Sequence, residues 1–175
     1  MSTVTGVQEP SQAYKRLISL ETFLDQYSDR EDLFKYEWNN GIVEKKERTM
    51  NRNQFNIYRK LQQLFINSQT CAQGGIIMSE VDIYLPSIKR IRRTDIAVLQ
   101  GELVDECLSG SPTACSFVIE IVSKNDQVNE VEDKIIEYFE NGVQVVWVII
   151  TKVKKVEVYT SVEDVKICFG DTVLA

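Results

Sequence analysis

The chain has 175 residues, a length that predicts one domain with a substantial buried core. Hydrophobic residues make up 43% and charged residues 26%, as in soluble globular proteins, and no apolar run approaches the roughly 20 residues of a membrane span. The net charge of −6 argues against a protein that coats nucleic acid non-specifically over its whole surface.

The first part of the chain predicts a leader, a short helix and a hairpin. Residues 1–18 are mostly small and polar and lack the apolar stretch of a signal peptide, so we expect a flexible leader before a single domain over 19–175. Ser19 can cap a helix that extends to Tyr27. The segment Asn39-Asn40-Gly41 predicts a hairpin between two strands, since Asn and Gly tolerate positive φ.

A second helix is expected over 53–66, and strands follow it. The apolar stripe of this helix is predicted to consist of Phe55, Tyr58, Leu61 and Phe65. A strand over 76–85 should end at Pro86, and a basic turn over 87–93 should lead into a strand over 95–99. Residues 100–114 have the composition of a polar loop.

The last part of the chain predicts a strand–helix–strand crossover. A helix over 128–140, closed by Asn141-Gly142, separates the apolar strands 115–122 and 143–150. Such a crossover favours parallel pairing of these two strands, whereas the short turns before them favour antiparallel pairing. With edge strands expected over 154–160 and 163–169, the fold class is α/β with a mixed central sheet.

The absence of histidine narrows the chemistry. It excludes Ser-His-Asp and Cys-His catalysis and any histidine-ligated zinc or iron. The four cysteines lack paired C-x-x-C spacing, which argues against zinc, and they suit a reducing cytoplasm better than a disulfide framework. Any metal is therefore expected to have oxygen ligands, which favours Mg²⁺ or Mn²⁺, with Ca²⁺ as a further option.

Two acidic residues lie on predicted strands. Asp95 begins the strand 95–99 and Glu120 lies within the apolar strand 115–122, where a carboxylate is costly to bury unless it is paired. If the faces that carry them coincide, both can hold one divalent cation, which polarises a phosphate and lowers the pKa of bound water. The alternatives are that Asp95 caps a turn and that Glu120 pairs with a lysine.

Other charged residues can each be interpreted either as part of the site or as ordinary surface charges. Lys134 borders the apolar stripe of the helix 128–140, so it can stabilise phosphate charge or extend outward to water. Glu37 can join the site as a ligand or as an outer acceptor, or it can be an exposed hairpin charge. A basic run before Asp95 can contact phosphates or form only a solvated turn; it contains Lys89, Arg90, Arg92 and Arg93.

These motifs together resemble the Uma2 family of restriction-endonuclease-like proteins, part of the PD-(D/E)XK nuclease superfamily. The resemblance covers about residues 19–160, and it is the order and spacing of the motifs that make it specific. The matching segments are residues 36–44 (YE-x-x-x-G), 94–98 (PD-x-x-V), 118–123 (V-x-E-V-x-S) and 134–147 (K-x-x-x-Y-x-x-x-G-V-x-x-x-W).

The resemblance implies a restriction-endonuclease-like fold, with a mixed central sheet flanked by helices, and Mg²⁺-dependent cleavage of DNA. By the same resemblance, Asp95 and Glu120 bind the metal, with Mn²⁺ as an alternative to Mg²⁺. The resemblance also implies that Lys134 is the catalytic lysine, moved from the strand to the helix, and that Glu37 is the early acidic residue of the site.

The chain departs from the family pattern at several positions. Thr94 replaces the proline before the aspartate. Val122 stands where the superfamily has the lysine of its E-x-K motif, which leaves Lys134 for that role and Lys124 as a fallback. The remaining departures are the missing histidine near Asn53 and the missing aspartate at Ile150.

We therefore expect a single-domain, metal-dependent nuclease that hydrolyses DNA. The rival is a catalytically inactive module on the same fold that binds nucleic acid or a protein, which the acidic net charge and Val122 favour. A small-molecule enzyme is disfavoured because no phosphate-binding Gly-rich loop or dinucleotide fingerprint is present. We also expect a cytoplasmic protein without a membrane partner, a homodimer through the edge strands near 154–169, and relatives that continue somewhat beyond Ala175.

Overall fold

The computed structural model describes residues 17–47, 52–109, 113, 115–122 and 128–170. Most of the predicted leader lies outside these ranges, but its last residue, Ile18, already belongs to the domain. Its backbone N–H donates to the carbonyl of Gly41 at 2.9 Å, and its own carbonyl accepts a hydrogen bond from the indole of Trp38. Within the described ranges, no helix has the length and apolar character needed to cross a membrane.

The described residues form an eight-stranded sheet, and its mixed character confirms the prediction. Its strands are β1 (Phe34–Asn39), β2 (Ile42–Glu47), β3 (Ile76–Leu85), β4 (Arg90–Leu99), β5 (Phe117–Val122), β6 (Val145–Ile150), β7 (Lys155–Tyr159) and β8 (Val165–Phe169). The order is β2-β1-β4-β5-β6-β7-β8, with β3 paired to β4. The β5–β6 pair is parallel and the other pairs are antiparallel, so both pairing predictions are confirmed.

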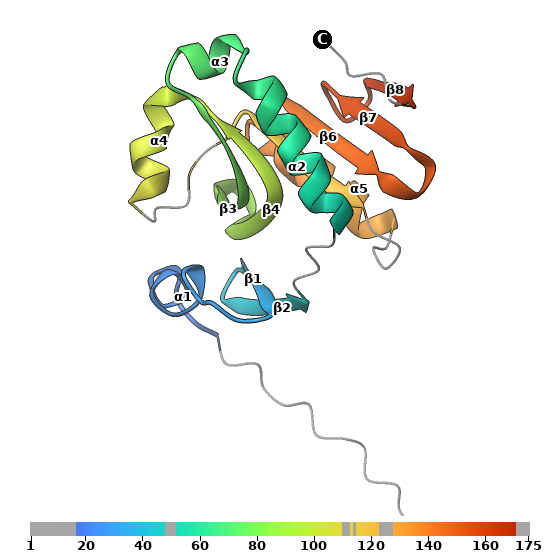
Figure 1. The fold of residues 1–175 in the computed structure, drawn as a ribbon. Coiled ribbons are helices and arrows are strands. Elements are labelled where there is room, and N and C mark those ends of the chain that lie inside the picture. Colours follow the sequence, from blue (N-terminus) through green and yellow to red (C-terminus); the bar gives the residue numbers. More distant parts are fainter. Residues whose placement is uncertain (1–16, 48–51, 110–112, 114, 123–127, 171–175) are drawn as a thin grey trace, which may run out of the picture.

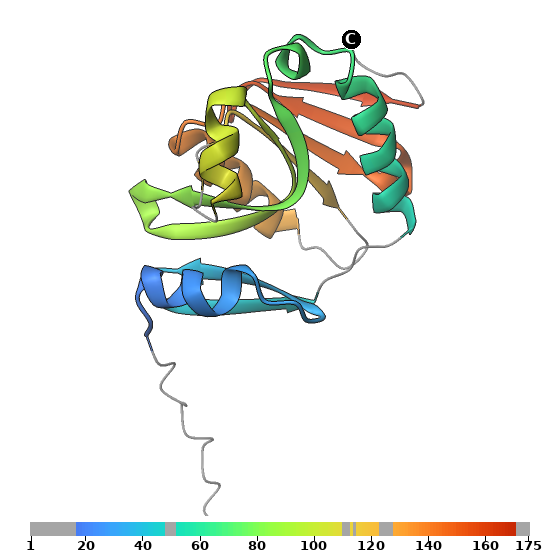
Figure 2. The same cartoon turned by 60° about the vertical axis from the view of Figure 1, so that its left-hand side comes forward.

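Helices cover both faces of the sheet (Figures 1 and 2). They are α1 (Leu20–Phe23), which continues as a π-helical turn over Leu24–Ser28, α2 (Arg52–Phe65), α3 (Gln69–Ala72), α4 (Gly101–Leu108) and α5 (Val128–Glu140). Ile135 and Tyr138 of α5 pack with Ala97 and Val118 of the sheet, whereas α2 packs on the opposite face. The α5 bounds match the prediction, and Ser19 caps α1 by accepting the Thr22 N–H.

The hairpin also forms where the sequence predicts it. Asn40 and Gly41 have φ of 44° and 97°, and they join β1 to β2. Together with α1, this hairpin lies at one end of the molecule, below the β3–β4 pair in Figure 2. Phe23 of α1 and Trp38 of β1 are buried in one core cluster, which packs α1 against the hairpin.

Two predictions about segment boundaries are wrong. The supposed polar loop 100–114 contains α4, because Val104 and Cys107 at helical spacing pack against the main core. The supposed basic turn 87–93 is shorter: a single 3₁₀ turn over Pro86–Ile88 precedes β4, which begins at Arg90. The arginines enter the strand because buried carboxylates pair with them, as detailed below.

The predicted stripe of the second helix is also wrong in one position. Phe55 is 58% exposed, whereas Ile57, Tyr58 and Leu61 pack against the sheet. The apolar face is therefore rotated from the predicted one. The helix orientation is set by contact with Ile96, Ile119 and Ile121, which the periodicity of the helix alone does not reveal.

The pairing of β4 creates the opening that contains the candidate site. One edge of β4 pairs with β3. The opposite edge pairs with β1 at Arg90 and Ile91 and with β5 only from Ile96 onward. Between these two contacts β1 and β5 diverge, so side chains rather than a strand face residues 92–95 of β4.

Candidate active site

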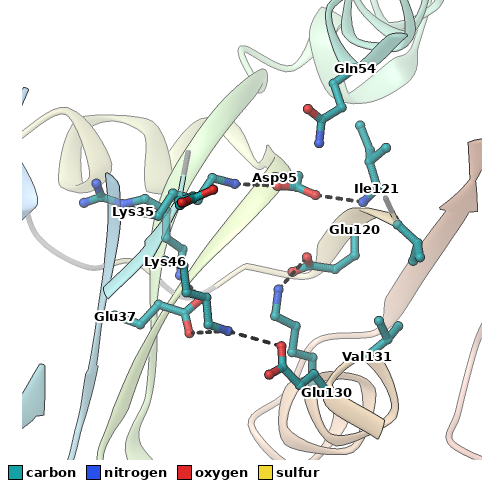
Figure 3. A pocket seen from close by; sticks show the side chains of 13 residues that line it. Lys35, Glu37, Lys46, Gln54, Asp95, Glu120, Ile121, Glu130 and Val131 are labelled. Carbon is teal, nitrogen blue, oxygen red and sulfur yellow. Dashed lines mark hydrogen bonds and ion pairs between the residues drawn. The ribbon is translucent and has the colours of Figure 1, made fainter. Parts of the chain in front are cut away.

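Charged side chains from five elements line a cavity of about 110 Å³ at this divergence. Figure 3 shows Lys35 and Glu37 of β1, Lys46 of β2, Asp95 of β4 and Glu120 of β5 around it. Lys134 and Glu130 of α5, Glu47 of β2 and Arg93 of β4 also line it. The structure thus brings Asp95, Glu120, Lys134 and Glu37, all singled out in the sequence, to one cavity.

Asp95 and Glu120 lie on the same side of the sheet. The β4–β5 register pairs Ile96 with Ile119 and Ala97 with Val118, so its continuation places Asp95 opposite Glu120. Ala97 and Val118, two residues from each acid along its strand, belong to one core cluster. The two faces that carry Asp95 and Glu120 therefore coincide, which is the condition for a shared cation.

Both carboxylate oxygens of Asp95 have partners. Oδ2 accepts the backbone N–H of Ile121 at 2.8 Å, which satisfies a donor where the β4–β5 ladder has ended. Oδ1 accepts from the ammonium of Lys35 at 2.5 Å. Asp95 is thus not merely the cap of a turn: it joins β5 to β1 through one carboxylate.

Glu120 is buried and is held by two side chains from α5. Lys134 Nζ lies 2.7 Å from Oε2, and the Tyr138 hydroxyl donates to Oε1 at 2.6 Å. Burial raises the pKa of Glu120, and the charge of Asp95 raises it further, while Lys134 lowers it; the net shift is upward. Burial lowers the pKa of Lys134, but Glu120, Glu37 and Asp95 outweigh it, so Lys134 stays an ammonium.

Glu37 is 2% exposed, so it is not an exposed hairpin charge. It accepts from Arg92 Nη1 at 2.9 Å and from the backbone N–H of Arg93 at 3.4 Å, and Lys46 Nζ lies 3.6 Å away. Burial raises the pKa of Glu37, but the positive charges of Lys134, Arg92 and Lys46 together lower it below its ordinary value. Glu37 is therefore an ionised residue at the inner wall of the cavity.

The predicted phosphate-contacting residues occupy different environments. Arg92 and Arg93 are each 4% exposed. Arg92 pairs with Glu37 and Glu137, Arg93 forms a two-bond contact with Asp82, and Arg90 pairs with Glu44 and Glu137. Lys89 is exposed in the turn before β4. The arginines therefore already neutralise carboxylates of the fold.

Two lysines that line the cavity, Lys35 and Lys46, were not predicted from the sequence. Lys35 lies two residues before Glu37 on the same strand, and Lys46 is its cross-strand partner in the hairpin register. Strand alternation already placed Lys35 on the face of Glu37, and that signal was sufficient to find it. Val122 lines the cavity without an ammonium, whereas the fallback residue Lys124 lies outside the described residues.

The donor chemistry of this cavity suits a hard divalent cation. Mg²⁺ is commonly held by one or two carboxylates and completes its shell with water or phosphate oxygens, and Asp95 and Glu120 provide such carboxylates. Across the part of the chain that the structure describes, no cluster of three or more Asp, Glu, Cys or His residues that could hold a metal ion occurs.

Comparison with known proteins supports the same interpretation. The Uma2 family model, described as "putative restriction endonuclease", matches residues 20–174. The chain belongs to the Uma2 family. No curated protein matches it significantly.

A solved structure shows that the Uma2 chain has a known fold. The crystal structure of a protein described as "a putative nuclease belonging to DUF820", from Anabaena variabilis ATCC 29413, superposes with a TM-score of 0.70. The two chains share 18% sequence identity, and the match covers 90% of this chain and 88% of that chain. Family and fold together confirm the predicted restriction-endonuclease-like architecture and support a nuclease.

Proposed function

We propose that this Uma2 protein is a divalent-metal-dependent nuclease that hydrolyses phosphodiester bonds of DNA. The observation that supports it most is the convergence of Asp95, Glu120 and Lys134, from β4, β5 and α5, on one cavity. DNA is preferred over RNA because the family description is that of a restriction endonuclease. When bound, Mg²⁺ or Mn²⁺ would polarise the phosphate and acidify an attacking water.

Each side chain then has a distinct role. Asp95 and Glu120 provide oxygen ligands from adjoining strands. Lys134 carries a fixed positive charge beside Glu120 and stabilises the negative charge that develops on the phosphate oxygens. Glu37 acts as a positioning residue, because its carboxylate is held by Arg92 and by the backbone of Arg93, while its charge acts on Lys46 and Lys134.

Substitution of the two proposed ligands tests this function. Asp95→Asn and Glu120→Gln should each lower Mg²⁺- or Mn²⁺-dependent nicking of supercoiled plasmid at least about 100-fold, because the amide is neutral and a poor ligand. Both variants should lose saturable Mn²⁺ binding in calorimetry. Asp105→Asn, at an exposed position of α4, is the matched control and should retain both. If either ligand variant nicks plasmid at the same rate as the parent, the proposal is refuted.

A second candidate is an inactive module that binds nucleic acid or protein. It is favoured by the contacts of the two acids, each of which already has a lysine partner, and by Val122 at the position of the usual lysine. For this candidate we expect neither Mn²⁺ binding nor nicking, but retained binding of duplex DNA or of a protein partner. The same titrations therefore separate the two functions.

We also propose a cytoplasmic homodimer that pairs through β8. This strand ends the sheet order and carries three apolar side chains that are 40–65% exposed: Val165, Ile167 and Phe169. A second copy that pairs with β8 would extend the sheet and satisfy its free backbone edge, and its own side chains would pack beside these three. Analytical ultracentrifugation should give a dimer for the parent and a monomer for Ile167→Lys, whereas a monomeric parent would exclude this assembly.

A further inference from the structure

Lys35 occupies the position next to Asp95 where a cation would be expected to bind. Its Nζ lies 2.5 Å from Asp95 Oδ1, and both side chains are 17% exposed. The other oxygen of Asp95 is engaged by the Ile121 N–H, so Lys35 covers the oxygen that faces β1 (Figure 3). A divalent cation at Asp95 must therefore contend with an ammonium that the protein itself supplies.

A second carboxylate lies within reach of the same ammonium. Glu80 Oε1 is 4.0 Å from Lys35 Nζ, close enough for a strong attraction in a partly buried setting. Glu80 belongs to β3, on the edge of β4 opposite to β1 and β5. Lys35 thus lies between one acid that contacts it and another to which it can shift by a small side-chain movement.

The backbone at Glu80 is unusual in a way that supports a functional role. Its φ is +57°, in the left-handed region that a non-glycine residue seldom adopts. The β3–β4 pairing runs through Ser79–Ile96 and resumes at Val81–Thr94, so it is interrupted where Glu80 faces Asp95. The strained residue and the break in the ladder both occur beside the proposed ligand.

We propose that Lys35 competes with the divalent cation for Asp95, and that Glu80 receives its ammonium when the cation binds. This inference rests on the proposed metal-dependent function. Without metal, Lys35 neutralises Asp95 and keeps it from being an unpaired, largely buried charge. With metal, Asp95 is neutralised by the cation, and Lys35 moves to the carboxylate of Glu80.

The charges in the cavity explain why this exchange would matter. Asp95 and Glu120 each pair with a lysine, Lys35 and Lys134 respectively, so a dication added without any rearrangement would meet two carboxylates that already have a positive partner. Competition by Lys35 lowers the intrinsic metal affinity, and Glu80 recovers part of it. Lys35 and Glu80 therefore change metal affinity in opposite directions, and they act as a coupled pair.

Mn²⁺ binding to the full chain tests the competition. By calorimetry, Lys35→Gln should bind Mn²⁺ about tenfold more tightly than the parent, within the usual range for coupled sites. Lys45→Gln is the matched control, because Lys45 lies over the Phe34 ring on the same hairpin and should leave the affinity unchanged. Unchanged or weaker binding by Lys35→Gln overturns the competition.

A double-mutant cycle tests the role of Glu80. Glu80→Gln should weaken Mn²⁺ binding several-fold in the parent. It should have no effect in the Lys35→Gln background, because that variant has no ammonium at residue 35 for Glu80 to accept. Equal weakening in both backgrounds would make Glu80 a direct ligand and refute its role as acceptor of Lys35. If neither the parent nor Lys35→Gln binds Mn²⁺ in an Asp95-dependent manner, the proposed function itself fails.

A measurement on the unmodified protein keeps the inference testable if Lys35→Gln does not fold. The ammonium ¹⁵N resonance of Lys35, assigned by its loss in Lys35→Arg, should shift on titration with Mg²⁺. The titration should saturate with the same midpoint as metal binding. A Lys35 resonance that stays unchanged through saturation would show that Lys35 does not leave Asp95.

Discussion

The ammonium of Lys134 lies 2.7 Å from Oε2 of Glu120, although the two residues come from different elements. Lys134 is on α5, which packs on the face of the sheet that carries Glu120. Val122, two residues after Glu120 on β5, would be the usual place for a lysine, and here it lines the same cavity. The positive charge beside Glu120 therefore comes from α5, because β5 has a valine at that position.

Removing the Lys134 charge should change the pH dependence of the site. In Lys134→Gln, the pKa of Glu120, already raised by burial, should rise further, because the attraction that lowers it is lost. A Glu120 that binds metal as proposed must be ionised, so Mn²⁺ affinity should begin to fall at a higher pH than in the parent as the pH is lowered. Calorimetric titrations across a pH series measure this, with Lys152→Gln, at an exposed position, as control. Superimposable pH profiles would rule out the interaction.

The Tyr138 hydroxyl should contribute measurably to stability. Tyr138→Phe leaves the ring but removes the donor to Glu120 Oε1, and hydrogen bonds to charged groups contribute about 1.5–3 kcal/mol. We expect a loss of about 2 kcal/mol in the free energy of unfolding by urea. Tyr159→Phe removes a comparable bond to Glu157 at a less buried position and should cost less. Equal losses would contradict the importance of burial here.

Glu37 should stabilise the protein in a pH-dependent manner. Its folded-state pKa is below the ordinary value of 4.5, so its contribution is present above that pH and is lost as the pH falls through the lowered pKa. Glu37→Gln should therefore destabilise the fold at pH 7 by about 3 kcal/mol, since it breaks a buried ion pair with Arg92. Urea unfolding from pH 7 to pH 3 should show this difference shrinking, and a constant difference would refute it.

Arg92 and Lys89 should differ in what they support. Arg92→Met should cost about 3–5 kcal/mol of stability, because it leaves the carboxylates of Glu37 and Glu137 without their shared partner. Lys89→Ala should leave stability nearly unchanged. If Lys89 contacts a phosphate, the Lys89→Ala substitution should also lower, by about one, the slope of log affinity for DNA against log salt concentration. Fluorescence anisotropy over a salt series measures the slope, and an unaltered slope would exclude Lys89 from the DNA contact.

Local patterns in the sequence were sufficient for much of the fold. Asn40-Gly41 predicts the hairpin and Asn141-Gly142 the end of α5, because both depend on the backbone freedom of a few adjacent residues. The crossover helix likewise predicts the parallel β5–β6 pair. Strand alternation predicts which neighbours share a face with Asp95 and with Glu120, but the β4–β5 register that places the two acids on the same side came from the structure.

Only the tertiary structure decided which charges are partners. Arg92 meets Glu37 and Glu137 across separations of 55 and 45 residues, and Lys35 meets Asp95 across 60. No local spacing encodes such contacts, because they depend on how β1 and β5 diverge along one edge of β4. The packing of α2 on Ile96, Ile119 and Ile121 likewise leaves Phe55 exposed. The arginines lie within β4, since a buried carboxylate requires a buried cation.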